Sequence, residues 1–414
     1  MDYFRFIIEN RRFLAFGVLL AGLSSYGQTF LISLFGGQIR AEFGLSNGDF
    51  GMVYSVATLV SGFTLIWLGR QLDRLDLRLF TALTLLGAFL GCMTMATANG
   101  LAMLGAAFLL LRICGQGLMM HTAQTSMARY FAEGRGKAVS IATLGLPVGE
   151  GVFPAMLVTV AGAIGWRGTW GGMGAVLIVV VLPFALWLLR GHAERHERLL
   201  AHERSVTTGN GGGVVEWRRR DVLRDRRFYL VLPSVLAPPF IMTALFFHQV
   251  PLAAEKGWTL QWLASCFVGF AASHITALLL SGPLVDRVGA QRILPFYLLP
   301  LAVALLVLVN LDQRFAALAY LMLAGISIGV TGTVMGALWA ELYGVKHLGA
   351  IRALAHSLMV LSTAVAPGLV GELLDAGFTM ADTAAALFVW VILASVLAWF
   401  AGAQRASVPA GEAG

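Results

Sequence analysis

Long stretches of apolar residues, separated by short polar connections, run through the whole chain. A helix needs about 20 apolar residues to cross the hydrocarbon core of a bilayer, because each residue advances it by only about 1.5 Å. Six stretches of this length fall in each half of the chain, near residues 13–36, 49–69, 78–98, 101–127, 137–163 and 167–190, and near residues 228–252, 260–282, 290–310, 314–340, 350–373 and 380–402. The sequence therefore predicts an all-α membrane protein with twelve transmembrane helices.

The composition supports a membrane protein and argues against a nucleic-acid-binding one. Hydrophobic residues make up 58% of the 414 residues and charged residues only 12%, and the mean hydropathy is +0.79. A soluble domain carries about twice that share of charged residues. The net charge of +7 would suggest a nucleic-acid partner in a soluble protein. Here the excess arginines lie at the ends of apolar stretches, where they orient helices in a membrane. We therefore expect the lipid bilayer, and no nucleic acid, as a partner.

Lysine and arginine are distributed unevenly among the connections. The odd-numbered connections carry only Arg40, Arg167, Lys256 and Arg314, whereas the even-numbered connections and the two ends carry nearly all the others. Cytoplasmic segments of membrane proteins are enriched in these residues. The pattern places both termini in the cytoplasm, and the first residues show no removable signal peptide. We expect a multi-pass protein of the plasma membrane, and specifically of a bacterial inner membrane.

A short motif occurs once in each half of the chain, each time at the end of an apolar stretch. The first copy reads G-R-Q-L-D-R-L-D-L-R and the second G-P-L-V-D-R-V-G-A-Q-R. The residues that define the motif are Gly69, Asp73, Arg74 and Arg78 in the first copy and Gly282, Asp286 and Arg287 in the second. The glycine lets two helices approach closely, and the Asp-Arg pair places charge at a cytoplasmic helix end. The repeat predicts two related halves, as in many secondary transporters.

A polar segment joins the two predicted halves. We expect an N-terminal six-helix bundle over residues 1–190, a cytoplasmic linker over 191–227, and a C-terminal six-helix bundle with a short tail over 228–414. The glycine tract in the linker is typical of a flexible spacer, and its final basic block is typical of an interfacial helix on anionic lipid. The linker histidines are expected on a solvated face rather than in a metal site; they are His192, His196 and His202.

Several segments resemble the major facilitator superfamily. The fourth apolar stretch contains L-L-L-R-I-C-G-Q-G and is followed by R-Y-F-A-E-G-R-G-K-A-V-S, and the fifth contains G-L-P-V-G-E-G. Together with the repeated motif and the central linker, these segments are similar to that superfamily over nearly the whole chain. The stretch E-L-Y-G-V-K-H-L-G-A-I-R, residues 341–352, looks like the branch of monocarboxylate and oxalate/formate carriers. In that branch an arginine often stands where this chain has Leu278.

The resemblance implies two six-helix bundles that face each other about a central cavity and alternate between two openings. It also implies that Asp73 and Asp286 stabilise the outward-open state through cytoplasmic contacts between the halves. A gate of this kind biases a two-state equilibrium.

Two charged residues fall near the middle of the membrane in neighbouring helices. Counted from the ends of their stretches, Arg112 lies about 16 Å and Glu150 about 20 Å into the bilayer. A lone charge at that depth is costly, so we expect the two to form an ion pair. The pair is either an inert bridge between two helices, or a site in which protonation of Glu150 releases Arg112 to bind a substrate anion. An arginine suits a carboxylate because its planar fork can bind both oxygens.

The remaining polar residues in the apolar stretches give further candidates. His274 is a candidate proton site or substrate donor, with a packing histidine as the alternative. Gln28 and Gln116 lie near the level of Arg112 and are candidate substrate-binding residues. His121 is about half a turn out of phase with Arg112 on a regular helix, so we expect it to contact a neighbouring helix. His248, near a helix end, is a candidate gate residue. Arg352 is either an inner gate residue or a positive-inside anchor, and the sequence favours the anchor.

The sequence suggests three candidate functions. Arg112, Glu150 and His274 favour proton-coupled uptake of a small organic anion, similar to a monocarboxylate. The G-L-P-V-G-E-G segment favours the alternative, a proton-driven antiporter that exports a drug or metabolite. An enzyme or a channel is disfavoured, since no catalytic cluster, nucleotide motif or selectivity loop is visible. The three cysteines lie inside apolar stretches and suggest neither disulfides nor metal ligands. We expect no cofactor and no metal, and a monomer.

Overall fold

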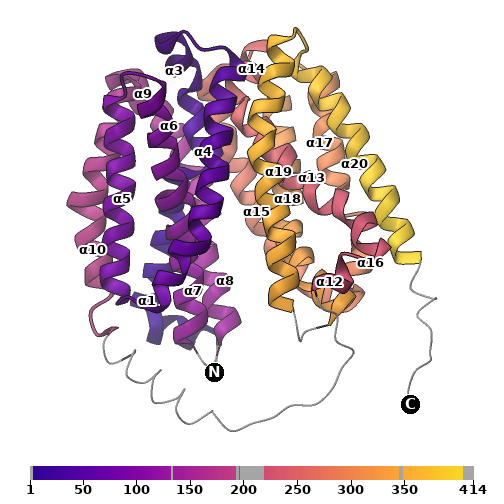
Figure 1. Cartoon of the computed structure of the whole chain (residues 1–414), viewed down its shortest axis with the longest axis horizontal. Helices are drawn as coiled ribbons and strands as arrows, with labels where there is room; N and C mark the ends of the chain where they lie inside the picture. The colour runs from indigo at the N-terminus through magenta and orange to yellow at the C-terminus, as the bar shows by residue number, and fades with distance from the viewer. Residues whose placement is uncertain (1–2, 132–133, 193–194, 196–218, 345–347, 404–414) are drawn as a thin grey trace.

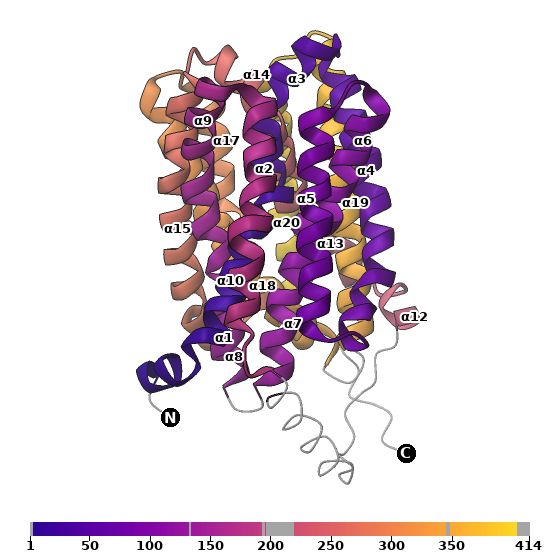
Figure 2. The same ribbon diagram turned by 90° about the vertical axis from the view of Figure 1, so that its left-hand side faces the viewer.

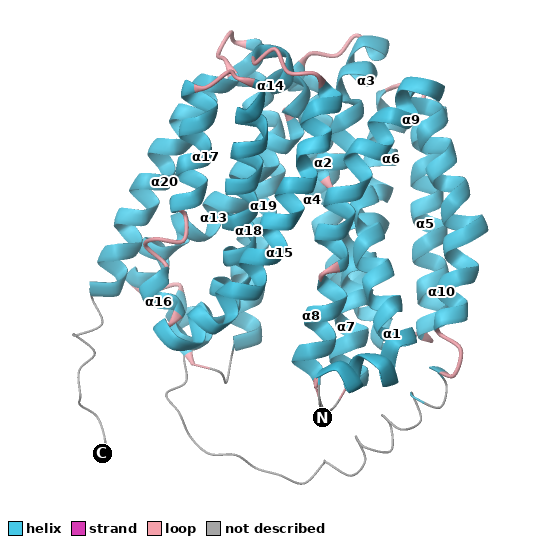
Figure 3. Cartoon of the chain, turned by 180° about the vertical axis from the view of Figure 1, so that it is seen from behind, coloured by secondary structure: helices cyan, strands magenta, loops and turns pink. Residues whose placement is uncertain are grey.

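The computed structural model describes residues 3–131, 134–192, 195, 219–344 and 348–403. The described residues form helices joined by short loops, and no strand occurs among them (Figure 3). The predicted all-α fold is confirmed. Residues 193–194 and 196–218, most of the predicted linker, lie outside the described residues.

The first half of the chain runs from α1 to α10. Its elements are α1 Tyr3–Leu23, η1 Ser24–Gly27, α2 Thr29–Ile32, η2 Ser33–Phe35, α3 Gly36–Phe43, α4 Asn47–Leu68, η3 Gly69–Asp73, α5 Leu77–Thr97, α6 Leu101–Leu110, η4 Leu111–Met119, α7 Met120–Tyr130, α8 Arg135–Thr143, α9 Gly145–Val176, η5 Leu177–Val181 and α10 Leu182–Leu188. The elements η4 and η5 are π-helical segments inside longer helices.

The second half runs from α12 to α20. Its elements are α12 Arg219–Val222, α13 Arg226–Phe247, α14 Gln249–Glu255, α15 Leu260–Val288, α16 Ala290–Ile293, α17 Leu299–Asn310, α18 Arg314–Tyr343, α19 Leu348–Asp375 and α20 Met380–Ala403. Figure 1 shows the two halves as separate groups of helices that stand side by side.

Nine helices in the described part of the chain are long and apolar enough to cross a membrane, or ten if the bent pair Arg5–Gly27 and Thr29–Phe43 is one span. One of the nine, Arg135–Leu188, is 54 residues long. It contains Gly165 with a φ of 73°, where the helix is broken. A further apolar helix, Leu299–Asn310, is shorter. The count is consistent with twelve spans, because the 54-residue segment crosses twice and Leu299–Asn310 adds one more to the ten.

Side-chain contacts show that this long segment reverses direction at Gly165. Just after the break, Arg167 donates hydrogen bonds to the carbonyl oxygens of Ala96 and Ala98 at the end of α5. At the end of α10, the Leu189 carbonyl oxygen accepts a hydrogen bond from Arg78 at the start of α5. The chain therefore runs along the length of α5 between these two points.

The two ends of the bundle differ in how closely the halves approach. We call the end where α1 begins and α20 finishes the linker end, and the opposite end the closed end (Figures 1 and 2). Toward the closed end, Ser33 donates a hydrogen bond to the Phe246 carbonyl oxygen at 2.5 Å, and Gln261 donates one to Thr159 at 3.2 Å. The ribbons of the two halves diverge toward the linker end (Figure 1).

The start of the linker corrects one expectation from the sequence. His192 is buried, with 1% of its surface exposed, rather than solvated. Its ring lies 4.8 Å from the ring of Tyr130 and 6.2 Å from that of Phe13. Aromatic rings on α1 and α7 therefore shield a polar residue that the sequence places in a charged segment. His196 and His202 lie outside the described residues.

Candidate functional site

The first membrane segment is interrupted near its middle. Gln28 has extended backbone angles, φ −79° and ψ 149°, between the short helices η1 and α2. The helical axes on its two sides differ by 50°. Irregular backbone at this depth is tolerated only where surrounding protein or a water-filled cavity provides hydrogen bonds for its free N–H and C=O groups. Interrupted helices of this kind commonly form substrate sites in transporters.

The fourth membrane segment is distorted at the same level. Its central part, η4, is a π-helix that contains Arg112 and Gln116. A Cβ at Gly27 would collide with the backbone of this segment, and a Cβ at Gly115 would lie 2.7 Å from the Gly27 nitrogen. Two glycines therefore let the interrupted helix and the π-helix touch through their backbones. π-Helical segments are frequent at functional sites.

Arg112 is buried beside this contact, with 5% of its surface exposed. Its Nη1 donates a hydrogen bond to the Tyr54 hydroxyl at 3.1 Å, and that hydroxyl is hydrogen-bonded to the Thr29 hydroxyl at 2.8 Å. The guanidinium carbon lies 5.3 Å from the centre of the Tyr54 ring. The Nε of Arg112 is buried without a hydrogen-bond partner. Within the described residues, no carboxylate forms an ion pair with this guanidinium.

The predicted ion pair between Arg112 and Glu150 is wrong. Glu150 instead contacts the other half of the chain, where its Oε2 lies 3.0 Å from the Nδ1 of His274. Both residues are buried, with 7% and 8% of their surfaces exposed. The pair joins α9 to α15, and therefore joins the two halves of the molecule.

Glycines on α9 explain why Glu150 faces the second half. Gly145 and Gly149 are one turn apart, and both pack against the backbone of α1. A Cβ at Gly149 would lie 2.7 Å from the Gly22 carbonyl oxygen. Since these glycines fix one face of α9 on α1, residues 150 and 151 turn toward α15. There a Cβ at Gly151 would lie 2.9 Å from the Cβ of Ala271.

A second pair of glycines braces the helix that carries His274. Gly325 and Gly329, one turn apart on α18, pack against α15. A Cβ at Gly329 would lie 2.6 Å from the His274 carbonyl oxygen. Small residues one turn apart are typical of close helix contacts in membranes. Both members of the Glu150–His274 pair are therefore held on tightly packed helices.

The two glutamines predicted for substrate binding lie at the junction of the interrupted helix and the π-helix. Gln28 is the extended residue, and Gln116 lies in η4 beside Gly27. Both side chains are partly exposed. The structure thus places Gln28, Gln116 and Arg112 on two touching segments, and His274 on the opposite half with Glu150.

Tyr54 and Thr29 are site residues that the sequence did not reveal. The Tyr54 ring lies 4.7 Å from the ring of Phe247 in the second half and 5.5 Å from that of Phe108. Tyr54 therefore links Arg112 to the contact between the halves. A tyrosine in an apolar stretch is ordinarily a packing residue, so only the spacing of its hydroxyl from Arg112 identifies it.

Comparison with known proteins identifies the family. The model of the Major Facilitator Superfamily matches residues 14–275. The chain belongs to the Major Facilitator Superfamily. It is therefore a multi-pass membrane transporter with the fold of that superfamily, whose members carry small molecules. No curated protein matches the sequence.

Two solved structures have a fold similar to that of this chain. A bacterial homolog of the human lysosomal transporter Spinster, inward-facing and unoccupied, has a TM-score of 0.66 at 14% identity, with 95% of this chain and 97% of that chain covered. A bacterial Spinster homolog in an inward-facing and occupied conformation has a TM-score of 0.65 at 15% identity, with 98% of each chain covered. At these identities the likeness shows the fold alone.

The repeated motif of this superfamily member lies at the linker end of each half. Gly69 begins η3, and its carbonyl oxygen lies 3.3 Å from the Nε2 of His121. This contact confirms that His121 meets a neighbouring helix. Gly282 lies inside α15, and Asp286 and Arg287 follow it as exposed residues.

The other three residues of the first copy are described to different extents. Arg74 is exposed, whereas the side chain of Asp73 lies outside the description. Arg78 is engaged within its own half, because its Nη2 donates to the Leu189 carbonyl oxygen at 3.0 Å. In this conformation no described hydrogen bond joins Arg74, Asp286 or Arg287 to the opposite half.

A carboxylate that the sequence did not single out holds the halves together at the closed end. Asp375, the last residue of α19, accepts hydrogen bonds from the backbone nitrogens of Asn47 at 3.1 Å and Gly48 at 2.6 Å. It also accepts one from the Asn47 side chain at 3.0 Å. These donors are the first residues of α4, so a carboxylate of one half caps a helix N-terminus of the other.

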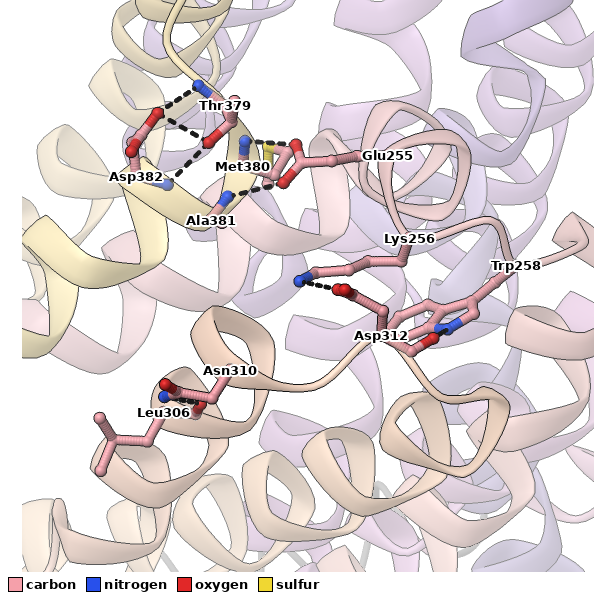
Figure 4. Close-up of polar contacts among 10 residues, drawn as sticks. All are labelled: Glu255, Lys256, Trp258, Leu306, Asn310, Asp312, Thr379, Met380, Ala381 and Asp382. Atoms are coloured by element: carbon pink, nitrogen blue, oxygen red, sulfur yellow. Dashed lines mark hydrogen bonds and ion pairs between the residues drawn. The ribbon is translucent and has the colours of Figure 1, made fainter.

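Each half is also fastened internally at the closed end. In the second half, Glu255 accepts hydrogen bonds from the nitrogens of Met380 at 2.6 Å and Ala381 at 3.0 Å, and Lys256 pairs with Asp312 at 2.6 Å (Figure 4). In the first half, the ion pair between Arg167 and Glu42 measures 2.6 Å and ties α3 to the turn after Gly165. Each half is therefore tied together internally at the closed end, whereas Asp375 joins the two halves.

The candidate gate residues predicted near helix ends make contacts within the second half. The Nε2 of His248 lies 3.0 Å from the Pro367 carbonyl oxygen. Arg352 donates to the Gly336 carbonyl oxygen. His248 lies at the closed end, next to the contacts between halves, whereas Arg352 is exposed.

Proposed function

We propose that this transporter takes up a small organic anion together with protons by alternating access. The observation that carries the proposal is Arg112, a buried guanidinium with no carboxylate partner among the described residues. Burying an uncompensated ion costs several kcal/mol, even after the protein relaxes. A substrate carboxylate would supply the missing charge and would satisfy the buried Nε.

The neighbours of Arg112 fit a carboxylate. The guanidinium offers a planar fork of donors, and the Tyr54 hydroxyl is the only acceptor that it has among the described residues. Gln28 and Gln116 add amide donors on the two touching segments. The likeness of residues 341–352 to monocarboxylate carriers points to the same substrate class. Glu341 in that segment caps α16 by accepting a hydrogen bond from the Ala290 nitrogen at 2.7 Å, so it has a structural role.

The Glu150–His274 pair is our proposed proton site. It bridges α9 to α15 and therefore joins the two halves. Protonating the carboxylate removes its charge and one acceptor, which weakens the bridge. Opening the closed end requires these helices to separate, so proton binding would favour that movement. A proton that binds at this pair from the outer side and is released on the cytoplasmic side would couple uptake of the anion to the proton gradient.

The orientation follows from the distribution of basic residues. We propose that the linker end and both termini are cytoplasmic, in a bacterial inner membrane, as the positive-inside rule favours. The described conformation is then inward-facing, as are the two solved structures with the same fold. The exposed motif residues at the linker end would form contacts between halves only in the outward-open state. We expect the transporter to work as a monomer without a cofactor.

Transport in proteoliposomes tests the proposal. Labelled small carboxylates should accumulate against their gradient when the outside is acidic, and Arg112→Lys should weaken their binding about tenfold without unfolding the protein. Lysine keeps the charge but loses the fork. A matched control is Arg292→Lys, which changes an exposed arginine at the linker end. If the two substitutions weaken carboxylate binding equally, Arg112 is not the anion site.

Proton-driven export of a drug or metabolite is the second candidate, favoured by the G-L-P-V-G-E-G segment. The same vesicles distinguish the two functions. An antiporter would expel a loaded cation or neutral drug when protons flow inward, and would show no uphill uptake of carboxylates. That result would replace the uptake proposal.

A further inference from the structure

A groove lies on the outer surface of the first half, at the linker end. It runs between the start of α5 and the end of α10 and has a volume of about 500 Å³. The residues that line it are Arg78, Leu79, Ala82, Pro183, Leu186, Trp187 and Arg190. The groove is remote from Arg112 and from the Glu150–His274 pair, so the proposed transport function does not account for it.

Positive charge gathers at one end of the groove. Arg78 uses its Nε and Nη2 on the Leu189 carbonyl oxygen, which leaves Nη1 without a described partner. The Arg190 side chain makes no ion pair or hydrogen bond with a described residue. Arg12 adds a third guanidinium, with its carbon 4.9 Å from the centre of the Trp187 ring. The carboxylate of Asp76 is close in sequence, but it accepts hydrogen bonds from the nitrogens of Arg78 and Leu79 as the cap of α5.

Apolar residues continue the groove toward the middle of the membrane. Ala82 lies four residues beyond Arg78 on α5, which corresponds to about 6 Å along a helix. Pro183 lies at the start of α10, and Arg190 follows the end of that helix. Leu79 and Trp187 present 50% and 44% of their surfaces on this outer face. The groove therefore has a basic end at the membrane boundary and an apolar path that leads into the hydrocarbon.

We infer that this groove binds one phospholipid with an anionic headgroup from the surrounding bilayer. The phosphate and headgroup would meet Arg78 and Arg190, while an acyl chain would follow Ala82, Leu186 and Pro183. Guanidinium groups bind phosphate oxygens through paired hydrogen bonds. Anionic lipids are attracted to basic segments at the cytoplasmic surface. A soluble phosphate would use the arginines alone and would leave the apolar path empty.

Native mass spectrometry of the full-length transporter in detergent tests the site. We expect one phosphatidylglycerol to stay bound where phosphatidylcholine does not. Arg190→Gln should weaken phosphatidylglycerol binding about tenfold, the loss typical of removing one charge-assisted interaction. Arg292→Gln is the matched control, because it removes an exposed arginine from the linker end of the other half. It should leave binding unchanged.

Several outcomes would overturn the inference. Equal retention of phosphatidylcholine would show that headgroup charge is not recognised, and equal loss in both variants would show that the lipid binds elsewhere. Competition by soluble glycerol phosphate at millimolar concentration would show a free phosphate site instead of a lipid site. Arg190 is exposed, so unfolding of its variant is not expected. A second variant, Ala82→Trp, fills the apolar path without changing charge and should also reduce lipid binding.

Discussion

Asp375 offers the sharpest test of how the closed end is held. The substitution Asp375→Ala removes three hydrogen bonds that cross from α19 to the first residues of α4. Loss of a capping side chain typically costs about 0.5–2 kcal/mol. Asp375 is exposed, so water replaces part of what is lost, and a cost of about 1–2 kcal/mol is reasonable. Because about 1.4 kcal/mol corresponds to tenfold, the ratio of closed to open molecules should fall about 5- to 30-fold.

Distances between spin labels across the closed end measure this ratio. Labels at Ala41 in α3 and Ala376 after α19 are on exposed positions of opposite halves. Asp375→Ala should increase the population with long distances, and Asp375→Asn should do so to a smaller extent. Asp382→Ala is the control, because Asp382 accepts its hydrogen bond from the Thr379 nitrogen at 2.9 Å within one half. An unchanged distance distribution in Asp375→Ala would refute the cap as a contact that stabilises this state.

Two further substitutions separate the anion site from helix packing. Tyr54→Phe keeps the ring against Phe247 but removes the hydroxyl. Carboxylate binding measured by calorimetry should therefore weaken several-fold, while the spin-label distances stay unchanged. Altered distances with normal binding would contradict the role of the hydroxyl. Gly145→Ala puts a Cβ against the α1 backbone and should destabilise the protein by about 1–3 kcal/mol, seen as a lower thermal unfolding midpoint. Gly162→Ala, where a Cβ meets nothing within 4 Å, should leave the unfolding midpoint unchanged or higher. If the two substitutions lower the midpoint equally, close packing of Gly145 on α1 does not explain its effect.

Much of the fold could be predicted because the bilayer imposes its thickness on the sequence. Runs of about 20 apolar residues marked the spans, and the repeated motif marked the two halves. The interruption at Gln28 was not predicted, although polar or small residues surround it, namely Ser24, Ser25, Gly27 and Thr29. The break depends on the close approach of Gly27 to η4, which is a tertiary contact.

For the candidate site, the sequence predicted which residues are buried but not the direction in which their side chains point. Depth along a helix correctly identified Arg112 and Glu150 as buried, but depth carries no information on rotation about the helix axis. Gly145 and Gly149 face α1 and thereby turn Glu150 away from Arg112 and toward His274. Asp375 and Tyr54 were missed because their roles depend on partners more than 50 residues away, Asn47 for the first and Arg112 for the second.

Uptake by the Glu150→Gln variant tests proton coupling most directly. Glutamine keeps the size of the side chain and a possible hydrogen bond to His274, but it cannot take up and release a proton. In proteoliposomes, Glu150→Gln should still exchange labelled for unlabelled carboxylate across the membrane, yet it should not accumulate the carboxylate against its gradient when the outside is acidic. Glu9→Gln, which removes an exposed carboxylate paired with Arg5, should behave like the unmodified protein. Uphill accumulation by Glu150→Gln at the unmodified rate would contradict the proton role and leave the Glu150–His274 pair as a structural bridge.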